Sequence, residues 1–213
     1  MQIEALALLY ADDALLVLDK PAGLLSVPGR GADKQDCLST RVQAVYADAL
    51  VVHRLDMATS GLILMARGTS AQRILSKAFA DRQVHKRYVA LVHGLPAQPL
   101  TPWGRIDLPI AVDWPNRPRR VIQPTGGKAS ITHWRVLAGA DSPYTRVELE
   151  PVTGRSHQLR VHMQAIGHPI VGDALYAGAS DLPADRLLLH ATEISFVHPV
   201  SGQAMHFESR PNF

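Results

Sequence analysis

Residues 53–67 read HRLDMATSGLILMAR, a polar segment followed directly by an apolar one. Its second half, residues 61–67, is a compact apolar run of the length of a buried strand. His53, Arg54 and Asp56 stand just before that run, so the chain places three polar side chains at the mouth of a core strand. Arg54 can hold the neighbouring carboxylate ionised, and an ionised carboxylate shielded from water is a nucleophile or a general base. An Arg–Asp ion pair that only caps a turn is the structural alternative.

Further strands are expected on both sides of this segment. Residues 6–18 predict two short strands, with Asp12 and Asp13 as the turn between them. Apolar runs predict other strands at residues 87–93, 129–138, 144–150, 187–197 and 203–208. Residues 94–127 are rich in Pro and Gly, which favours loops with one or two short strands.

Three helices are predicted between these strands. Asp36 is expected to cap a helix over residues 37–47, Ser70 a second helix, and Ser156 a third helix that ends near residue 166. The second helix places one apolar face toward the core, made of Ile74, Leu75, Ala78 and Phe79. This order of elements predicts an α+β fold with a mostly antiparallel mixed sheet and packed helices, in a single catalytic domain over residues 1–213.

The composition is that of a globular protein. The chain has 213 residues, of which 46% are hydrophobic and 19% charged, which excludes disordered and fibrous classes. No apolar run approaches the ~20 residues of a membrane helix, and the N-terminus lacks the basic start of a secretory signal. Cys37 is the one cysteine, which excludes an internal disulfide framework and favours a reducing compartment. We expect a cytoplasmic protein, and a monomer because the chain is long enough to bury its own core.

Charge is unevenly distributed along the chain. Residues 54–130 hold twelve Lys and Arg against four acids, whereas the remainder holds ten against fifteen. A basic middle third between acidic ends suggests an anionic partner, with nucleic acid as the first candidate. A solvated basic face that balances charge elsewhere is the alternative.

A second polar segment, residues 153–160, reads TGRSHQLR. A glycine turn there leads into a helix N-terminus, where backbone N–H groups favour an anion. Arg160 lies at the border of the apolar stripe of that helix, so it is positioned to reach an active-site carboxylate. A contact of these arginines that serves only the fold is the alternative.

Two other segments combine basic residues with an aromatic ring. Tyr88 follows a basic triplet, residues 85–87, at the start of a strand. That combination suits a ring beneath a nucleobase with phosphate contacts beside it. Residues 114–120, WPNRPRR, join a tryptophan to three arginines in the same way. A core tyrosine and a solvated loop explain the same residues.

Six ordered segments together resemble the RluA family of pseudouridine synthases. They span roughly residues 15–199 and read KPAGLL at 20–25, HRLDMATSG at 53–61, KRY at 86–88, GRSHQLRVHM at 154–163, GHPIVGD at 167–173 and LLLHA at 187–191. The segments SVPGR at 26–30 and DWPNRP at 113–118 are most similar to compact members of the family. Those members carry no S4-type RNA-binding domain, and we expect none here.

The resemblance implies roles for individual residues. Asp56 is expected to be the catalytic aspartate, Tyr88 the active-site tyrosine that lies against the target base, and Arg160 the basic residue that pairs with the aspartate. Arg54 is expected to help displace the flipped nucleotide. The remaining residues that match the motifs are expected to bind substrate: His53, Lys86, Arg87, Arg155, His157 and Gln158.

The resemblance also implies the reaction and its substrates. Specific uridines would be flipped out and isomerised to pseudouridine, in a loop of 23S rRNA and in the tRNA anticodon stem-loop. The isomerisation gains no atom and changes no oxidation state, so no cofactor and no metal is expected. A synthase that acts on rRNA alone or on tRNA alone, and an RNA-binding protein that has lost the reaction, are the alternatives.

Two other classes of enzyme are disfavoured. Neither Ser60 nor Ser156 lies in the G-x-S-x-G turn of a serine hydrolase. The ten histidines are scattered without metal-ligand spacing, and there is only one cysteine to support them.

Overall fold

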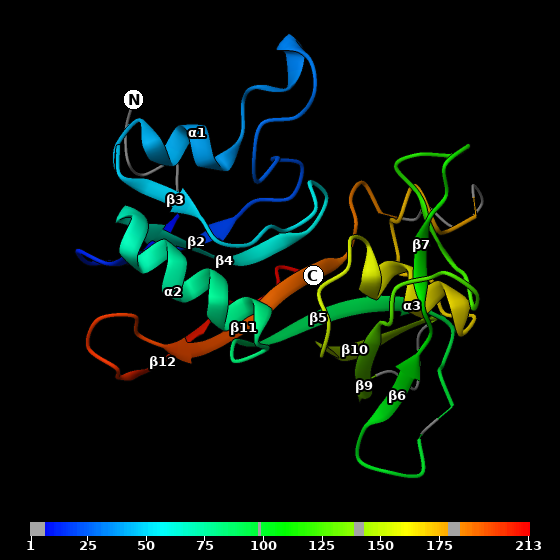
Figure 1. Cartoon of the computed structure of the whole chain (residues 1–213). Coiled ribbons are helices and arrows are strands. Elements are labelled where there is room, and N and C mark those ends of the chain that lie inside the picture. Colours follow the sequence, from blue (N-terminus) through cyan, green and yellow to red (C-terminus); the bar gives the residue numbers. More distant parts are fainter. Residues whose placement is uncertain (1–6, 98, 139–142, 179–183) are drawn as a thin grey trace. The chain divides into compact units, whose positions relative to one another are not determined.

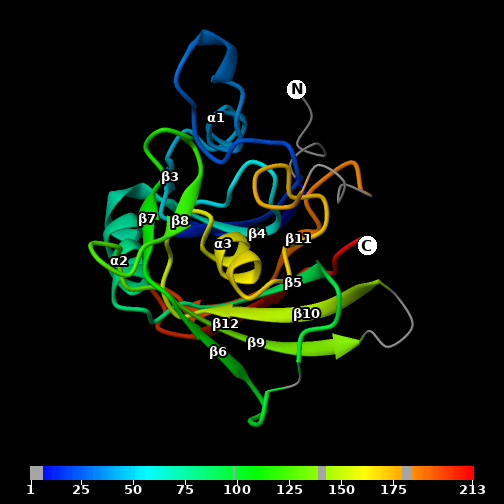
Figure 2. The same cartoon turned by 90° about the vertical axis from the view of Figure 1, so that its right-hand side faces the viewer.

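The computed structural model describes residues 7–97, 99–138, 143–178 and 184–213 (Figure 1). Contacts between Cα atoms group the chain into two compact units. The first comprises Met1–Lys86 with His190–Asn212, and the second comprises Arg87–Leu189 with Phe213. Strands dominate both units and helices are few, which confirms the predicted α+β class (Figures 1 and 2). The single domain over residues 1–213 stays a prediction.

The first unit is built on a mixed sheet. Its strands are β1 (Leu8–Ala11), β2 (Leu15–Lys20), β3 (Ala49–Val51), β4 (Ser60–Arg67), β11 (Leu189–Val197) and β12 (Ala204–Glu208). The order is β1-β2-β4-β11, while β3 also pairs with β4 and β12 with β11. The pair β4–β11 is parallel and the others are antiparallel. Strand β4 is buried along nearly its whole length, as the apolar run 61–67 predicted.

Helix α2 (Gly68–Ala80) packs on this sheet. Leu75 is fully buried in one cluster with Leu15, Leu62 and Phe196, and burial of such a side chain stabilises the fold by about 1.5–3 kcal/mol. Ile74 is 46% exposed, so the predicted apolar face of this helix was wrong at that position. The face that points inward is centred on Leu75 and Ala71 instead.

The N-termini of both helices in this unit differ from the prediction. Helix α2 begins at Gly68, directly after β4, so Ser70 lies inside the helix and does not cap it. Helix α1 (Leu38–Gln43) begins after Cys37, whose backbone N–H donates to Oγ1 of Thr40 at 3.2 Å. A short 3-10 helix, Ala32–Lys34, precedes it. Asp36 does not cap α1, because its carboxylate pairs with Arg41 at 2.7 and 2.6 Å.

In its described residues, the second unit is an antiparallel sheet with one helix. Strands β5 (His85–His93), β10 (Tyr144–Pro151), β9 (Ile131–Ala138) and β6 (Gly104–Asp107) pair in that order, and β5 belongs to this unit from Arg87 onward. Strands β7 (Ile110–Val112) and β8 (Arg120–Ile122) form a separate hairpin. The described part of residues 94–127 thus holds three short strands, one more than the upper number predicted.

Helix α3 (Gln158–Ala165) is attached to this sheet by buried polar side chains. Oε1 of Gln158 accepts from Oγ1 of Thr153 at 2.7 Å, and its Nε2 donates to Oγ1 of Thr132 at 3.0 Å. Nδ1 of His162 lies 2.9 Å from the same hydroxyl. The helix begins after His157, a left-handed residue with φ 58°, so the predicted cap at Ser156 was wrong. The start of α3 is set by Gln158 and its contacts with distant strands.

Side chains alternate across the sheet of the second unit. Tyr88 pairs with Leu149, which in turn pairs with Trp134, so these residues point to one face. Thr132, which binds α3, points to the same face. Arg87 points to the opposite face. Tyr88 and helix α3 therefore share one face of this sheet.

Within the described residues, no helix has both the length and the apolar character required to cross a membrane.

Candidate active site

Asp56 lies in the loop between β3 and β4, and the backbone on both sides of it is held in place. The Oγ of Ser26 donates to the carbonyl of Leu55 at 2.7 Å and accepts from the N–H of Leu55 at 3.1 Å. The N–H of Gly23 donates to the carbonyl of Met57 at 2.8 Å. Asp56 itself is half-buried. Hydrogen bonds to both neighbours restrict where its carboxylate can point, which a reacting group requires.

Lys20 lies beneath the same loop, at the end of β2, and is fully buried. Its Nζ donates to the carbonyls of Pro21 at 2.8 Å, Leu24 at 2.8 Å and Met57 at 3.2 Å. Burial lowers the pKa of Lys20 to about 8, while the charge of Asp56 opposes that shift. The ammonium group thus supports the Asp56 loop and places a positive charge near the carboxylate. No role was predicted for Lys20 from the sequence, although a lysine at the end of an apolar strand can indicate a buried charge that supports a neighbouring loop.

His53 and Arg54 have different surroundings. Arg54 is exposed, as contact with a nucleotide would require. His53 stacks on the ring of Phe79 with centroids 4.4 Å apart, and its Nε2 accepts from the N–H of Leu64 at 2.9 Å. Burial of the ring, aided by the charge of Lys86, lowers the pKa of His53 to about 3. His53 is therefore neutral and supports β4, while its binding of substrate stays a prediction.

Lys86 and Arg87 contact other side chains of the protein. The Nζ of Lys86 lies 5.6 Å from the ring centroid of Phe79, and burial lowers its pKa. Arg87 forms ion pairs of 3.6 Å with Glu148 and with Glu150. Because Arg87 and Tyr88 point to opposite faces of the sheet, they do not share one site in the second unit.

Arg160 is held by a buried carboxylate in the second unit. Its Nε donates to Oδ2 of Asp173 and its Nη2 to Oδ1, both at 2.7 Å. Arg160 is 5% exposed and Asp173 is fully buried. A bidentate pair of this kind fixes the plane of the guanidinium group. Asp173 appeared in the sequence only as part of a motif, and its pairing with Arg160 could not be inferred from spacing.

The other residues of the segment 153–160 divide into exposed and buried groups. Arg155 is exposed, and its backbone N–H donates to Oε1 of Gln158 at 3.1 Å. Gln158 is 4% exposed, and both ends of its amide bind the protein. Nδ1 of His157 lies 2.8 Å from the hydroxyl of Tyr176. Arg155 is thus available to an anionic ligand, whereas the contacts of Gln158 are those of a positioning residue.

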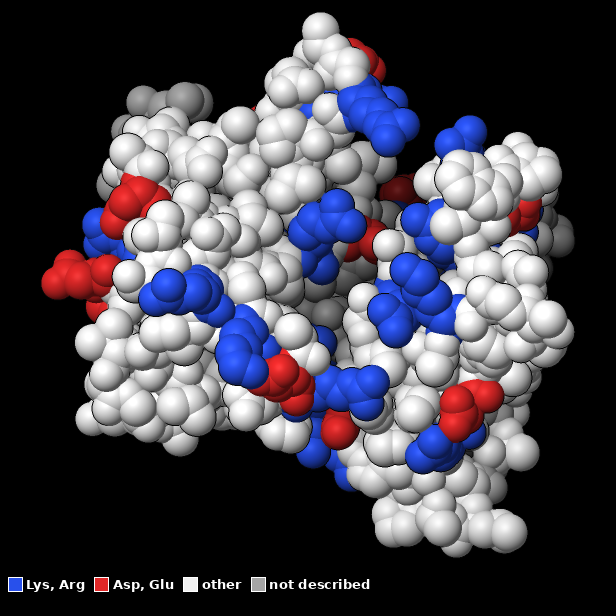
Figure 3. Space-filling model, in the orientation of Figure 1, with Lys and Arg blue, Asp and Glu red and all other residues white. Residues whose placement is uncertain are grey.

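The loop of the β7–β8 hairpin, residues 113–119, presents basic and aromatic side chains. Trp114 is 66% exposed, and the guanidinium carbon of Arg117 lies 4.8 Å from its ring centroid. Both carboxylate oxygens of Asp113 accept from the amide of Asn116, at 3.1 and 3.0 Å, which braces the loop. Figure 3 shows Lys and Arg at several places on one face of the molecule, and Asp and Glu at fewer. These features suit a polyanion with unpaired bases.

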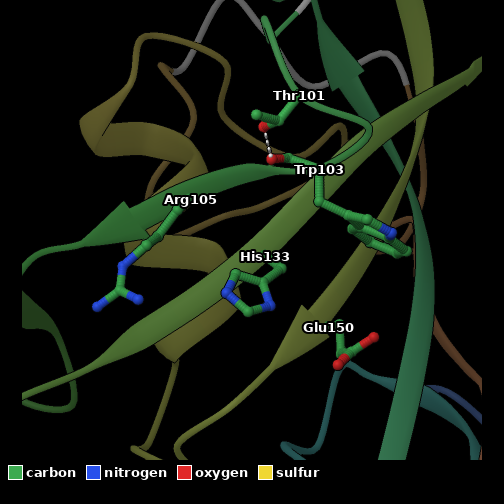
Figure 4. A pocket seen from close by; sticks show the side chains of 5 residues that line it. All are labelled: Thr101, Trp103, Arg105, His133 and Glu150. Carbon is green, nitrogen blue, oxygen red and sulfur yellow. Dashed lines mark hydrogen bonds between the residues drawn. The ribbon is translucent and has the colours of Figure 1, made fainter.

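A cavity of about 410 Å³ lies elsewhere in the second unit (Figure 4). Its lining residues are Thr101, Trp103, Arg105, His133 and Glu150. The charges there are paired within the protein, since Arg105 binds Asp107 at 2.5 Å and Glu150 binds Arg87. None of the predicted site residues lines this cavity, so we do not assign the chemistry to it. Among the described residues, no cluster of His, Cys, Asp and Glu could hold a metal ion.

Comparisons with known proteins give a consistent result. Residues 14–165 match the family model described as RNA pseudouridylate synthase. A curated relative from Yersinia pestis, "Dual-specificity RNA pseudouridine synthase RluA", is 48% identical over 206 residues, which cover 96% of this chain and 98% of the relative. The protein of the same name from Escherichia coli (strain K12) is 47% identical over 209 residues, or 98% of this chain and 94% of the relative.

Solved structures agree with these sequence matches. The structure titled "Human RNA Pseudouridylate Synthase Domain Containing 1" has a TM-score of 0.79 and 28% sequence identity, and the match covers all of this chain and 86% of that one. A second human structure, "Human RNA Pseudouridylate Synthase Domain Containing 4", has a TM-score of 0.77 at 24% identity over 98% of this chain and 90% of its own. At 24% identity, the second structure shows a likeness of fold alone.

Proposed function

Because the chain belongs to the RNA pseudouridylate synthase family, we propose that it isomerises specific uridines of RNA to pseudouridine, with Asp56 as the catalytic residue. The observation that best supports this proposal is that hydrogen bonds hold the backbone on both sides of Asp56. Ser26 binds Leu55 on one side of it, and Gly23 and Lys20 bind Met57 on the other. A carboxylate restrained in this way, with an ammonium group below it, is preorganised for attack on a bound nucleotide.

The reaction breaks the bond between N1 of uracil and C1′ of ribose and forms a bond between C5 and C1′. Asp56 has three routes to this result: attack on C1′, addition to C6 of the base, or removal of the 2′ proton. Each route requires the ionised carboxylate, whose charge interacts with that of Lys20. The proton lost from C5 is balanced by the one gained at N1, so the residues of the chain need no redox partner.

The flanking residues have proposed roles in binding. Extrusion of a nucleotide costs a few kcal/mol of stacking, and stacking on an aromatic ring returns about 1–3 kcal/mol per base. We assign that stacking to Tyr88 and the displacement of the nucleotide to the exposed Arg54. Arg155 is assigned a phosphate contact. The pairing of Arg160 with the catalytic aspartate, which the family resemblance implies, remains part of this proposal.

The substrate class is RNA, and two RNAs are proposed. The curated relatives are named as dual-specificity enzymes, which supports a 23S rRNA loop and a tRNA anticodon stem-loop as substrates. Both present unpaired bases between phosphates, which suits the Trp114 ring and the arginines of the β7–β8 loop. A synthase restricted to one of these RNAs is the alternative. We propose that the enzyme acts in the cytoplasm as a monomer.

Tritium release tests the proposal. Transcripts that carry 5-³H-uridine, an anticodon stem-loop and a 23S rRNA fragment in parallel, are incubated with the protein, because glycosylation at C5 expels the label to water. We expect release from both transcripts. Release from one supports the single-substrate alternative. Absence of release from both, and from bulk rRNA and tRNA labelled in the same way, refutes the proposal and leaves an RNA-binding protein.

A further inference from the structure

Tyr176 lies at the centre of a buried cluster in the second unit. Its side chain is 4% exposed and belongs to one apolar cluster with Ile110, Ile122 and Val161. Ile110 and Ile122 are the outer residues of the β7–β8 hairpin, whereas Val161 belongs to α3. One aromatic ring therefore contacts both the base of the hairpin and the helix that carries Arg160.

The hydroxyl of Tyr176 joins the same two elements. It accepts from the backbone N–H of Arg120, the first residue of β8, at 2.8 Å. It also lies 2.8 Å from Nδ1 of His157, the residue that precedes α3. The hydroxyl oxygen has two lone pairs and one proton, so it can take part in both hydrogen bonds at once. One hydroxyl thus connects the hairpin to the start of α3.

Two guanidinium groups lie near the ring of Tyr176. The guanidinium carbon of Arg160 is 5.0 Å from the ring centroid, and that of Arg119 is 5.7 Å from it. Asp173 connects the ion pair to the tyrosine, because its Oδ1 accepts from Nη2 of Arg160 at 2.7 Å and from the N–H of Tyr176 at 3.2 Å. The position of Arg160 and the position of Tyr176 are thus set by one buried carboxylate.

We propose that Tyr176 is a positioning residue that couples the β7–β8 hairpin to Arg160. The proposal rests on the proposed function, in which the hairpin contacts RNA and Arg160 pairs with the catalytic aspartate. RNA bound by residues 113–119 restricts the movement of β8. The contacts of the ring and hydroxyl of Tyr176 then restrict the positions of His157 and Arg160. Binding and chemistry then depend on one side chain that contacts neither the base nor the ribose.

Two substitutions separate the hydroxyl from the ring. Tyr176→Phe keeps the ring beneath Arg160 but removes both hydrogen bonds of the hydroxyl, the one to the N–H of Arg120 and the one to Nδ1 of His157. We expect the KM for the RNA to rise about tenfold while kcat stays within about twofold, since the net loss of buried hydrogen bonds between neutral groups corresponds to roughly that change. Tyr176→Leu also removes the ring, and we expect kcat to fall about tenfold in addition. The matched control is Tyr46→Phe, in the first unit, whose ring also lies beside an arginine, Arg67 at 5.2 Å. It is expected to change neither constant.

Hydrogen exchange tests whether the hydroxyl links the hairpin to the start of α3. In Tyr176→Phe we expect the amides of residues 110–122 and of residues 157–161 to exchange faster together, by about tenfold. Faster exchange in only one of the two segments, or an unchanged KM and kcat in both folded variants, overturns the coupling. If the wild-type protein isomerises no uridine, the proposed function fails, and the exchange experiment still decides whether Tyr176 links the two elements.

Discussion

Ser26 and Leu55 are joined by two hydrogen bonds through a single hydroxyl, although they are 29 positions apart in the chain. The Oγ of Ser26 donates to the carbonyl of Leu55 and accepts from its N–H, and Leu55 directly precedes Asp56. Ser26 is 5% exposed, so water does not compete for these bonds. The position of the proposed catalytic carboxylate thus depends on a serine in a distant loop.

Replacement of Ser26 should lower turnover more than binding. In Ser26→Ala both backbone groups of Leu55 lose their partner, which costs about 1–3 kcal/mol and loosens the Asp56 loop. We expect kcat to fall about tenfold with KM nearly unchanged, measured by tritium release at varied RNA concentration. Ser195→Ala removes a hydroxyl that pairs with His206 on an exposed strand and serves as the control. Equal effects of the two substitutions would contradict the positioning role.

Asp56→Asn is expected to abolish turnover and leave RNA binding and unfolding unchanged. The amide has nearly the shape of the carboxylate but cannot act as a nucleophile or a base at neutral pH. Tritium release measures turnover, a filter-binding titration measures affinity, and circular dichroism follows unfolding. Asp33→Asn, at an exposed position, controls for the loss of one negative charge. Turnover by Asp56→Asn above the protein-free rate would remove Asp56 from its proposed role.

The pKa of Lys20, about 8, predicts a pH limit on activity. Below pH 8 the amine is protonated, supplies three hydrogen bonds to carbonyls and places a positive charge near Asp56. Above pH 8 it loses its proton, so both the positive charge and one donor are lost as the pH rises. We expect kcat to fall through about pH 8 with the loss of a single proton, in rates measured at saturating RNA from about pH 6 to about pH 10.

Lys20→Met tests the assignment of that limit. Provided that the variant keeps its native circular dichroism spectrum, its lower kcat should not decline near pH 8. Lys34→Met, in an exposed segment, should retain the wild-type profile. A decline near pH 8 that persists in Lys20→Met would assign the titration to another group.

The buried pair of Arg160 and Asp173 should contribute strongly to folding. Asp173→Asn removes the buried carboxylate that binds the guanidinium group of Arg160, and we expect the free energy of unfolding to fall by about 3–5 kcal/mol. Urea denaturation measures this change. Asp107→Asn breaks an exposed Arg–Asp pair, with Arg105, and is expected to cost only about 0–1 kcal/mol. A similar cost for both variants would show that Asp173 does not hold a buried charge.

The basic side of the β7–β8 loop should control the salt dependence of RNA binding. The triple replacement of Arg117, Arg119 and Arg120 by Ala should weaken binding and reduce the slope of log K against log salt by about 0.7–0.9 for each phosphate that is no longer neutralised. The control is the triple replacement of Arg30, Arg41 and Lys77, basic residues of the first unit. An unchanged slope in the loop variant would identify these arginines as a solvated face.

Local sequence patterns predicted most of the fold. The apolar run 61–67 predicted β4 to within one residue, and the strand pattern at 144–150 predicted β10 equally closely. Helix starts were predicted less well. Asp36, Ser70 and Ser156 are all good capping residues in isolation, yet each helix begins elsewhere. Capping preferences amount to about 1 kcal/mol, which contacts between distant segments readily outweigh.

The α+β class and the ordered motifs around Asp56, Tyr88 and Arg160 could be predicted from the sequence, and the motifs indicated the family. Which polar groups form hydrogen bonds with each other became known only from the folded structure. Ser26 binds Leu55, Gln158 binds Thr132, and Tyr176 binds Arg120, across 29, 26 and 56 positions of chain. Periodicity reports which face of a helix or strand is apolar. A hydrogen bond between two buried polar groups far apart in the chain leaves no periodic trace, because it depends on where the folded backbone brings a donor and an acceptor within about 3 Å.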